Sequence, residues 1–243
     1  MDFYIGTSGW SYEGWLGNFY PEKIKSSLIL PYYAQTFDSV EINNSFYQIP
    51  KEKNVTNWAE ISPPNFIFSC KANRYITHIQ KLKEVEGSTT RLLEAFSHLG
   101  EKLGPILFQF PPYWPKDIPT LQKFIEFLPK EYRYTFEFRH KNWFCDELYE
   151  LLNTHQMALC FYNHKTYTTP LISTAPFIYI RMHGPNEEAY EGAYEEATLS
   201  EYAERFIDWQ KEGKKVFCYF DNDEKANAPK DAKRLKDMLI QFS

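Results

Sequence analysis

Two glutamates and a histidine are the residues of this sequence best suited to acid–base chemistry. Glu41, Glu137 and His183 each stand at or near the C-terminal end of a short run of β-forming residues, where polar and apolar side chains alternate. Carboxylates and imidazoles transfer protons near neutral pH when their surroundings adjust their pKa values. We therefore expect these three residues to be catalytic, with Glu41 or Glu137 as the general acid or base. His183 is expected to be a further acid–base group or to orient the ligand.

Alternation along the strands identifies a wider polar set around these residues. Over residues 134–139, Tyr134, Phe136 and Phe138 share one face, so Glu137 and Arg139 share the other. An isolated buried charge is costly, so we expect Glu137 to form an ion pair with a neighbouring arginine. The same test on the other strands, extended to the segments that follow them, gives the candidates for ligand binding: Asn43, Lys71, Arg74, Gln109, Arg139, Arg181, Tyr219 and Asp221.

Basic residues in this set indicate an anionic ligand. Lys71, Arg74, Arg139 and Arg181 fall near the C-terminal ends of three strands, and guanidinium groups match the oxygens of phosphate and carboxylate. A small polar molecule, phosphorylated or carboxylated, is therefore the expected partner, and a hydrolase, isomerase or lyase is the expected kind of enzyme. The alternative is that these charges only neutralise one another as a buried ion-pair network.

Two further chemistries would use the same carboxylates. A glycosidase would need Glu41 and Glu137 about 5–9.5 Å apart, a spacing that strands two and five of a barrel meet only marginally. A divalent metal could bind His183, Asp221 and the two glutamates, but the nearby basic residues would repel it. We therefore predict no cofactor and no metal, and keep a divalent metal as a minority hypothesis.

The segment after the first strand is rich in aromatic residues: Trp10, Tyr12, Trp15, Phe19 and Tyr20. These rings either close one end of the protein as a hydrophobic plug or stack on a sugar or nucleobase. Trp10 and Tyr12 are the two expected to touch a ligand. Nucleic-acid binding or processing, with bases on these rings and phosphates on the basic residues, is the alternative function. A ligand sensor without catalysis is a third.

Bulk composition narrows the class of protein. The 243 residues carry a net charge of −5, which disfavours broad electrostatic binding to nucleic acid or to an anionic membrane. No secretory signal or long apolar span is visible, and the four cysteines show no CxxC or CxxH spacing. These features predict a reduced cytoplasmic protein that does not act at a membrane.

Eight short β-rich runs, separated by helical or turn-like segments, must position these residues. Strands alternating with helices predict a parallel sheet, and eight of them predict closure into a single-domain (β/α)₈ barrel of the TIM type over residues 1–243. Active sites of such barrels lie at the C-terminal ends of the strands. The runs are Phe3–Thr7, Ser39–Asn43, Phe66–Lys71, Pro105–Phe110, Tyr134–Arg139, Ala158–Asn163, Phe177–His183 and Lys215–Asp221.

Helix signals occupy most of the spacers. Thr198 and Glu201 have the spacing of a capping box, which predicts a helix that opens there, and Gly213 is the residue expected just past its end. The spacer between the sixth and seventh strands is short, which predicts that this unit lacks a full helix.

Six motifs stand in order along the chain: GTSGWSY (6–12), FDSVEINNSFY (37–47), KLGPILFQ (102–109), EFRH (137–140), RMHG (181–184) and YFDND (219–223). Together they resemble the YecE-like family of uncharacterised TIM-barrel proteins, a family of domains of unknown function. The resemblance covers almost the whole chain and implies the fold and the site positions, but no reaction. The sixth strand of that family commonly ends in Asp, whereas this sequence has Asn163 there, which weakens any mechanism that needs a carboxylate at that position.

Overall fold

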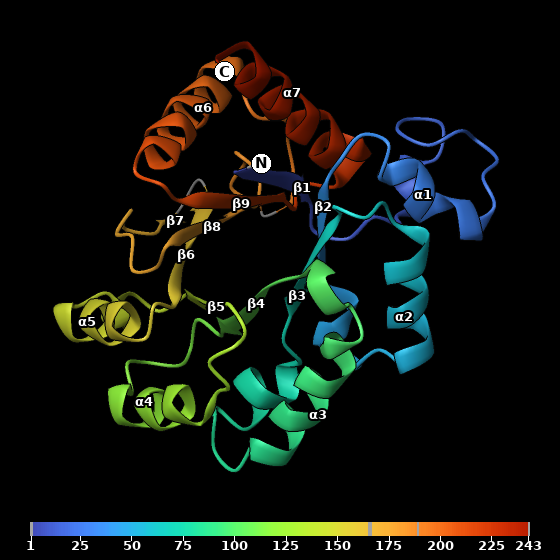
Figure 1. Ribbon diagram of the computed structural model, residues 1–243. Helices are drawn as coiled ribbons and strands as arrows, with labels where there is room; N and C mark the ends of the chain where they lie inside the picture. Colours follow the sequence, from blue (N-terminus) through green and yellow to red (C-terminus); the bar gives the residue numbers. More distant parts are fainter. Residues whose placement is uncertain (1, 165–166, 189, 243) are drawn as a thin grey trace.

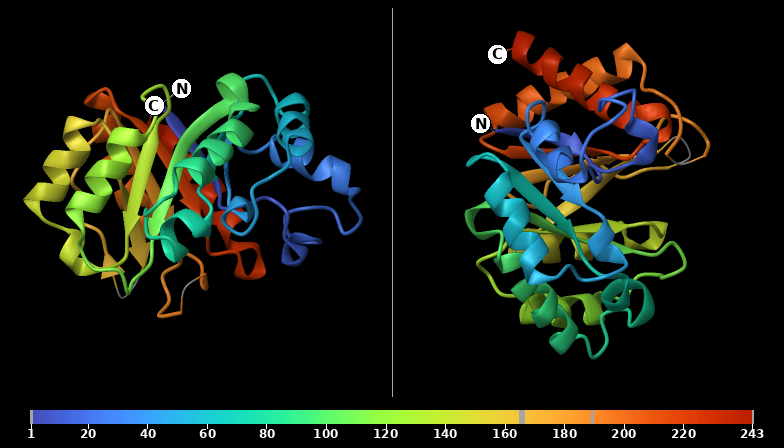
Figure 2. Two further views of the ribbon diagram at one scale, coloured as in Figure 1. Left: turned by 90° about the horizontal axis from the view of Figure 1, so that it is seen from below. Right: turned by 90° about the vertical axis from the view of Figure 1, so that its right-hand side faces the viewer.

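Eight parallel strands curve into a barrel surrounded by helices, as Figures 1 and 2 show. The computed structural model describes residues 2–164, 167–188 and 190–242. Its strand order, β1-β9-β8-β6-β5-β4-β3-β2, confirms the predicted (β/α)₈ barrel of the TIM type. The strands are β1 (Phe3–Thr7), β2 (Ser39–Ile42), β3 (Ile67–Lys71), β4 (Leu103–Phe110), β5 (Tyr134–Phe138), β6 (Ala158–His164), β7 (Tyr167–Thr168), β8 (Phe177–Met182) and β9 (Lys215–Phe220).

Two seams of the barrel have few backbone hydrogen bonds. β1 and β2 meet through a bridge between Ser8 and Glu41, where the Gly9 N–H donates to the Glu41 carbonyl oxygen at 2.7 Å. β5 and β6 are in register only at Thr135 with Ala158 and at the following pair. Beyond these pairs the C-terminal halves of β5 and β6 are not paired with each other, which leaves room for side chains at the mouth.

Helices cover the outer face of the barrel. In Figure 1, α6 and α7 lie over β1, β8 and β9, whereas α4 and α5 lie on the opposite side over β4, β5 and β6. Between β6 and β8 the described residues form only the short antiparallel β7, so the prediction of an incomplete helical unit is confirmed. The helices are α1 (Ile29–Tyr33), α2 (Glu52–Ile61), α3 (Glu86–Ser97), α4 (Ile118–Phe127), α5 (Asp146–Thr154), α6 (Glu196–Lys211) and α7 (Asn227–Phe242).

The start of α6 differs from the expected capping box. The helix begins at Glu196, with Glu195 as an N-cap whose side chain makes no capping hydrogen bond, so Thr198 already lies inside the first turn. The Glu196 carboxylate in this turn interacts favourably with the helix dipole. The C-terminal end is as predicted, because Gly213 follows the helix with a φ of +77°.

Two apolar layers fill the protein. One lies between the barrel and its helices and holds most of the core. The other fills the N-terminal half of the barrel interior and consists of Leu107, Ala158, Cys160, Phe177, Tyr179, Phe217 and Tyr219. We call this second layer the apolar floor. The polar residues that follow on the same strands lie on its C-terminal side. No helix in the described part of the chain is long and apolar enough to cross a bilayer.

Gly6 allows β1 and β2 to approach closely. A Cβ at this position would lie 2.0 Å from the Ser39 carbonyl oxygen, which is a backbone atom and cannot move aside cheaply. We expect Gly6→Ala to lower the free energy of unfolding by about 3 kcal/mol, measured by urea denaturation. Gly14→Ala is the control, because nothing lies within 4 Å of its new methyl group. Equal stability of the two variants would contradict this account of the seam.

Candidate active site at the C-terminal ends of the strands

Arg181, from β8, is the centre of the polar cluster. Its side chain is only 1% exposed, and its guanidinium contacts three carboxylates. Nε and Nη2 donate to Glu41 at 2.9–3.1 Å, Nη1 donates to Glu137 at 3.0 Å, and Nη2 also donates to Asp221 at 3.0 Å. Buried charges of opposite sign offset one another's desolvation when they are well paired, as they are here.

Glu41, from β2, has both carboxylate oxygens occupied. Besides the bonds from Arg181, Oε1 accepts from the Ser8 hydroxyl at 2.6 Å and Oε2 accepts from the Tyr179 hydroxyl at 2.7 Å. Its side chain is fully buried. Glu41 therefore has little capacity left to take a proton from a ligand, and its main effect is to fix Arg181.

Glu137, from β5, is held in the ionised form. Oε1 accepts from Gln109 Nε2 and from Arg139 Nε, each at 2.7 Å, and Oε2 accepts from Arg181. Burial by itself raises the pKa of this carboxyl, but Arg139 and Arg181 outweigh burial and hold the pKa well below its ordinary value. The predicted ion pair of Glu137 is confirmed. A carboxylate with so low a pKa is a poor general acid at neutral pH.

His183 is neutral, and its proton can be placed on one nitrogen. Nε2 lies 3.1 Å from Arg181 Nη1, and because a guanidinium can only donate, Nε2 must accept. The proton is therefore on Nδ1, which lies 3.0 Å from Asp221 Oδ2 but is not aimed for a hydrogen bond. Burial and the charge of Arg181 lower the pKa of His183 to about 4. Both ring nitrogens face protein groups, so His183 orients the cluster.

Lys71, the last residue of β3, lies at the edge of this cluster. Its side chain is buried, and Nζ lies 4.3 Å from the centre of the Phe46 ring. Among the described residues no carboxylate comes within 4 Å of Nζ. Burial and then the charge of Arg181 lower the pKa of the amine to about 8.

Arg139 and Arg74 form the basic rim beside Lys71. Arg139 has a side chain that is 23% exposed, and its guanidinium lies 5.0 Å from the centre of the Tyr162 ring. Arg74 is exposed, with its guanidinium 5.6 Å from the centre of the Tyr47 ring. Three positive side chains therefore converge on the β3 and β5 side of the mouth, as the sequence predicts.

The segment after β3 brings a further residue to this rim, His78, which sequence reasoning missed. It lies on a π-helical turn (Tyr75–Ile79), a geometry that often marks functional sites. The next residues include Lys81, Leu82 and Glu84 with φ values of 48°, 64° and 53°, which are strained for side chains other than glycine. Burial and the charges of Lys71 and Arg139 lower the pKa of His78 to about 4. No sequence motif indicates such a turn.

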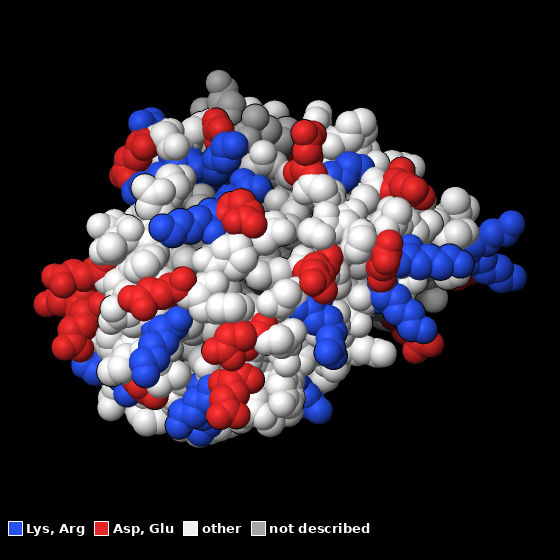
Figure 3. Space-filling view, turned by 60° about the horizontal axis from the view of Figure 1, so that its bottom comes forward, with Lys and Arg blue, Asp and Glu red and all other residues white. Residues whose placement is uncertain are grey.

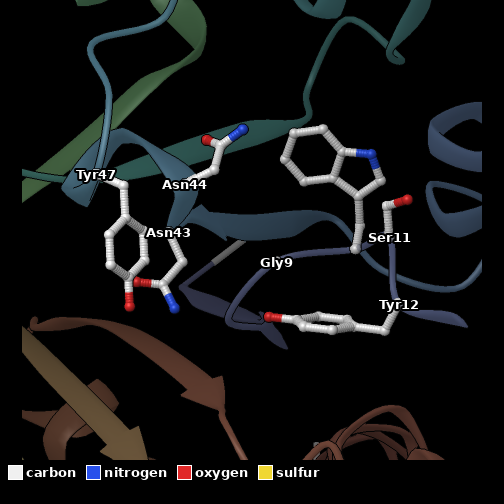
Figure 4. A pocket seen from close by; sticks show the side chains of 7 residues that line it. Gly9, Ser11, Tyr12, Asn43, Asn44 and Tyr47 are labelled. Carbon is white, nitrogen blue, oxygen red and sulfur yellow. The ribbon is translucent and has the colours of Figure 1, made fainter. Parts of the chain in front are cut away.

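A cleft of about 320 Å³ opens beside the cluster, between the segments that follow β1 and β2. Figure 4 shows Tyr12 entering it from the first segment and Asn43 and Tyr47 from the second. The predicted ligand contacts Trp10, Tyr12 and Asn43 all line this cleft. Burial raises the pKa of the Tyr12 hydroxyl, which donates to the Ser8 carbonyl oxygen at 2.5 Å.

The aromatic rings of the first segment divide between the outer core and the cleft. Trp15 and Tyr20 are buried in the outer core, as in a hydrophobic plug. Trp10 and Tyr12 are only partly buried and face the cleft.

Two residues singled out in the sequence, the predicted ligand contact Tyr219 and the family departure Asn163, lie outside the charged cluster. Tyr219 is fully buried in the apolar floor, where its hydroxyl contacts Ser39 Oγ at 2.6 Å and Ser69 Oγ at 2.8 Å. Asn163 accepts a hydrogen bond from the Tyr194 hydroxyl at 3.1 Å, on the helix side of β6. The Asn in place of the family's Asp therefore does not remove a carboxylate from the charged cluster.

Ser8 and Tyr162 belong to the site but were not predicted. Both follow from alternation, because Ser8 continues the inward series of Tyr4 and Gly6, and Tyr162 that of Ala158 and Cys160. The described residues contain no group of three or more His, Cys, Asp and Glu side chains able to hold a metal. The guanidinium of Arg181 lies among the carboxylates that the metal hypothesis used.

The fold and this cluster define a TIM-type barrel with a closed ion cluster inside and a basic rim at the mouth. The chain belongs to the family described as "Protein of unknown function DUF72", whose model matches residues 4–242. It is 31% identical to the UPF0759 protein YecE of Escherichia coli K12 over 142 residues, which are 58% of this chain and 50% of that protein. It is 26% identical to the UPF0759 protein YunF of Bacillus subtilis, over 99% of this chain and 96% of that protein.

Solved structures of the same family superpose closely. A DUF72 family protein from Thermotoga maritima is 30% identical, with a TM-score of 0.87 over 99% of this chain and 100% of that one. A DUF72 family protein from Enterococcus faecalis has a TM-score of 0.84 at 21% identity, over 98% of this chain and 95% of that one. The names of these relatives assign no reaction.

The neutral state of His183 makes stability depend on pH. Its pKa in the folded protein, about 4, lies below the ordinary value of 6.5, so between these values the unfolded chain binds more protons. This contribution is fully present above pH 6.5 and is lost as the pH falls toward 4. From pH 7.5 to pH 5 we expect it to lower the free energy of unfolding by about 2 kcal/mol.

Urea denaturation of His183→Gln at both pH values checks this expectation. The variant should lose about 2 kcal/mol less than the wild type between pH 7.5 and pH 5. His98→Gln, at an exposed position, should behave like the wild type. An equal fall in His183→Gln and the wild type would contradict the assignment of His183 as a buried neutral group.

Proposed function

We propose that the mouth of the barrel binds a small polar anion and that the chain is an enzyme acting on it. The observation that supports this proposal most directly concerns the guanidinium of Arg139. It donates to Glu137 through Nε, and among the described residues its two terminal nitrogens have no hydrogen-bond acceptor. These nitrogens lie at the partly exposed edge of the cluster, where phosphate or carboxylate oxygens would satisfy them.

The distribution of charge supports the same site. The three carboxylates are gathered around Arg181, whereas Lys71, Arg74 and Arg139 lie toward β3 and β5. A ligand on this side would meet positive potential close to a low-dielectric interior, which strengthens the attraction. The remainder of the ligand would occupy the cleft lined by Trp10 and Tyr12.

Within this proposal the carboxylates act as supports. Glu41 and Glu137 have their oxygens bonded by the protein, and His183 has both nitrogens facing protein groups. The sequence suggested Glu137 as a general acid or a general base. Because Glu137 is ionised, it could act only as the base, by accepting a proton. Such a transfer would require a ligand to displace Gln109 or Arg139 from Glu137 Oε1.

A second candidate function is binding of single-stranded nucleic acid. A further hollow of about 710 Å³ adjoins the cleft through Asn44 and Tyr47, and Lys51, Lys53 and Trp58 also line it. Aromatic rings with nearby lysines suit stacked bases and phosphates. Over the face shown in Figure 3, acidic and basic side chains are interspersed and form no continuous basic surface. Affinity for a short oligonucleotide that falls steeply with salt would favour this candidate.

Replacing Arg139 tests the anion site. We expect Arg139→Met to weaken the binding of inorganic phosphate and glucose 6-phosphate about 10- to 100-fold in calorimetric titrations, because charge-assisted hydrogen bonds are lost.

The control is Arg133→Met, at the opposite end of β5. Arg133 donates to the Leu103 carbonyl oxygen and stacks on Phe217, far along the strand from the mouth. It should leave the affinity unchanged. Equal affinity of the wild type and Arg139→Met, or no binding at millimolar phosphate, would refute the anion site.

A further inference from the structure

Lys71 carries a buried amine that forms no direct ion pair with any carboxylate of the described residues. Its backbone is fixed, because the Lys71 carbonyl oxygen accepts from the Ser45 hydroxyl at 2.6 Å at the end of β3. Nζ rests against the Phe46 ring and makes no hydrogen bond to any described residue. The site thus presents a single primary amine at a defined place beside the basic rim.

Other partly buried lysines of the chain differ from Lys71. Lys102 donates to two carbonyl oxygens and a hydroxyl, and Lys236 pairs with Asp38 at 2.6 Å. A buried ammonium without such acceptors is costly, and the positive charge of Arg181 adds to the cost. Burial and Arg181 accordingly lower the pKa of Lys71 to about 8, so a substantial fraction of the amine is neutral at physiological pH. A neutral amine is a nucleophile toward carbonyl carbon.

We propose that Lys71 forms an imine with a small carbonyl compound that bears an anionic group, such as an α-keto acid or a phosphorylated ketone. This inference rests on the proposed anion site, since Arg139 and Arg74 would hold the anionic group beside Nζ. The Lys71 nitrogen bonds to the carbonyl carbon, and the C–O bond breaks. Two protons of the ammonium leave with the oxygen as water, so an ammonium and a ketone give a protonated imine and water, with one positive charge on each side.

The neighbouring groups suit this chemistry. Phe46 excludes water from one side of Nζ, and Glu137 and Glu41 lie close enough to favour a positive charge on the nitrogen electrostatically. The iminium is positively charged at any pH near neutrality, so these buried carboxylates would stabilise it relative to the neutral amine.

Reductive trapping tests the inference. The wild-type protein is incubated at pH 7.5 with pyruvate and sodium cyanoborohydride, digested, and mapped by mass spectrometry. Lys71 should gain a carboxyethyl group at least about tenfold faster than the exposed Lys23, because each pKa unit corresponds to a tenfold change in neutral amine. Lys71→Arg, which retains the charge, should lose this modification, and Lys23→Arg should keep it. Labelling of Lys71 no faster than Lys23 would overturn the proposal.

A second arm separates this inference from the anion site. Arg139→Met should slow labelling of Lys71 by pyruvate about tenfold or more and leave labelling by the uncharged acetaldehyde unchanged. If both probes label Lys71 rapidly in Arg139→Met, Lys71 is supported as a nucleophile and anion binding by Arg139 is refuted. If phosphate binding depends on Arg139 but neither probe labels Lys71 faster than Lys23, the anion site is supported and Lys71 is refuted as a nucleophile.

Discussion

A guanidinium that is 1% exposed must have its charge and its five N–H groups satisfied inside the protein, and Arg181 meets this constraint with groups from four other strands or their ends. Ser8 follows β1, Glu41 lies on β2, Glu137 on β5, and Asp221 follows β9. Each group reaches Arg181 only if its strand has the correct register and tilt. The ion cluster therefore ties opposite sides of the barrel together at the level where the apolar floor ends.

This constraint divides the polar residues of the mouth into two groups. Glu41, Glu137, Asp221 and His183 face Arg181 and are occupied by it or by one another. On the β3 and β5 side, Arg139 joins this set only through Nε. Its terminal nitrogens and Lys71 Nζ have no hydrogen-bond acceptor among the described residues. Ion-pair stabilisation and ligand binding, which the sequence poses as alternatives, are therefore compatible: the ion pairs surround Arg181, and the proposed anion site lies beside them. The proposed ligand and the proposed nucleophile both lie on the side of Lys71 and Arg139.

Alternation of polar and apolar residues was sufficient to predict most of this arrangement. In β5 the aromatic residues at 134, 136 and 138 had to face the helices, which left Glu137 inside and predicted its pairing with arginine. The same reasoning applied to β6 would have placed Tyr162 inside and Asn163 outside. It was not sufficient for Tyr219, because alternation gives the face of a strand but not the depth along the barrel. Hydrogen-bond saturation of Glu41 and the proton position on His183 depend on atoms from several strands and could not be read from local sequence.

The segment after β3 shows another limit of sequence reasoning. Its π-helical turn and the positive φ values at Lys81, Leu82 and Glu84 have no glycine or proline signal. The turn brings His78 against Phe46, with ring centres 4.9 Å apart, so that Phe46 contacts both His78 and the Lys71 amine. Strain of this kind is maintained by surrounding packing.

The central claim is that Arg139 and Arg181 keep the buried Glu137 carboxylate ionised, so that it can hold both guanidinium groups at the mouth. A ¹³C NMR titration of the side-chain carboxyl of Glu137, assigned by comparison with Glu137→Gln, tests it most directly. The account predicts that this carbon stays at its ionised chemical shift as the pH falls well below 4.5, the ordinary pKa, until the protein unfolds. Titration of Glu137 at or above pH 4.5 in the folded protein would contradict the account.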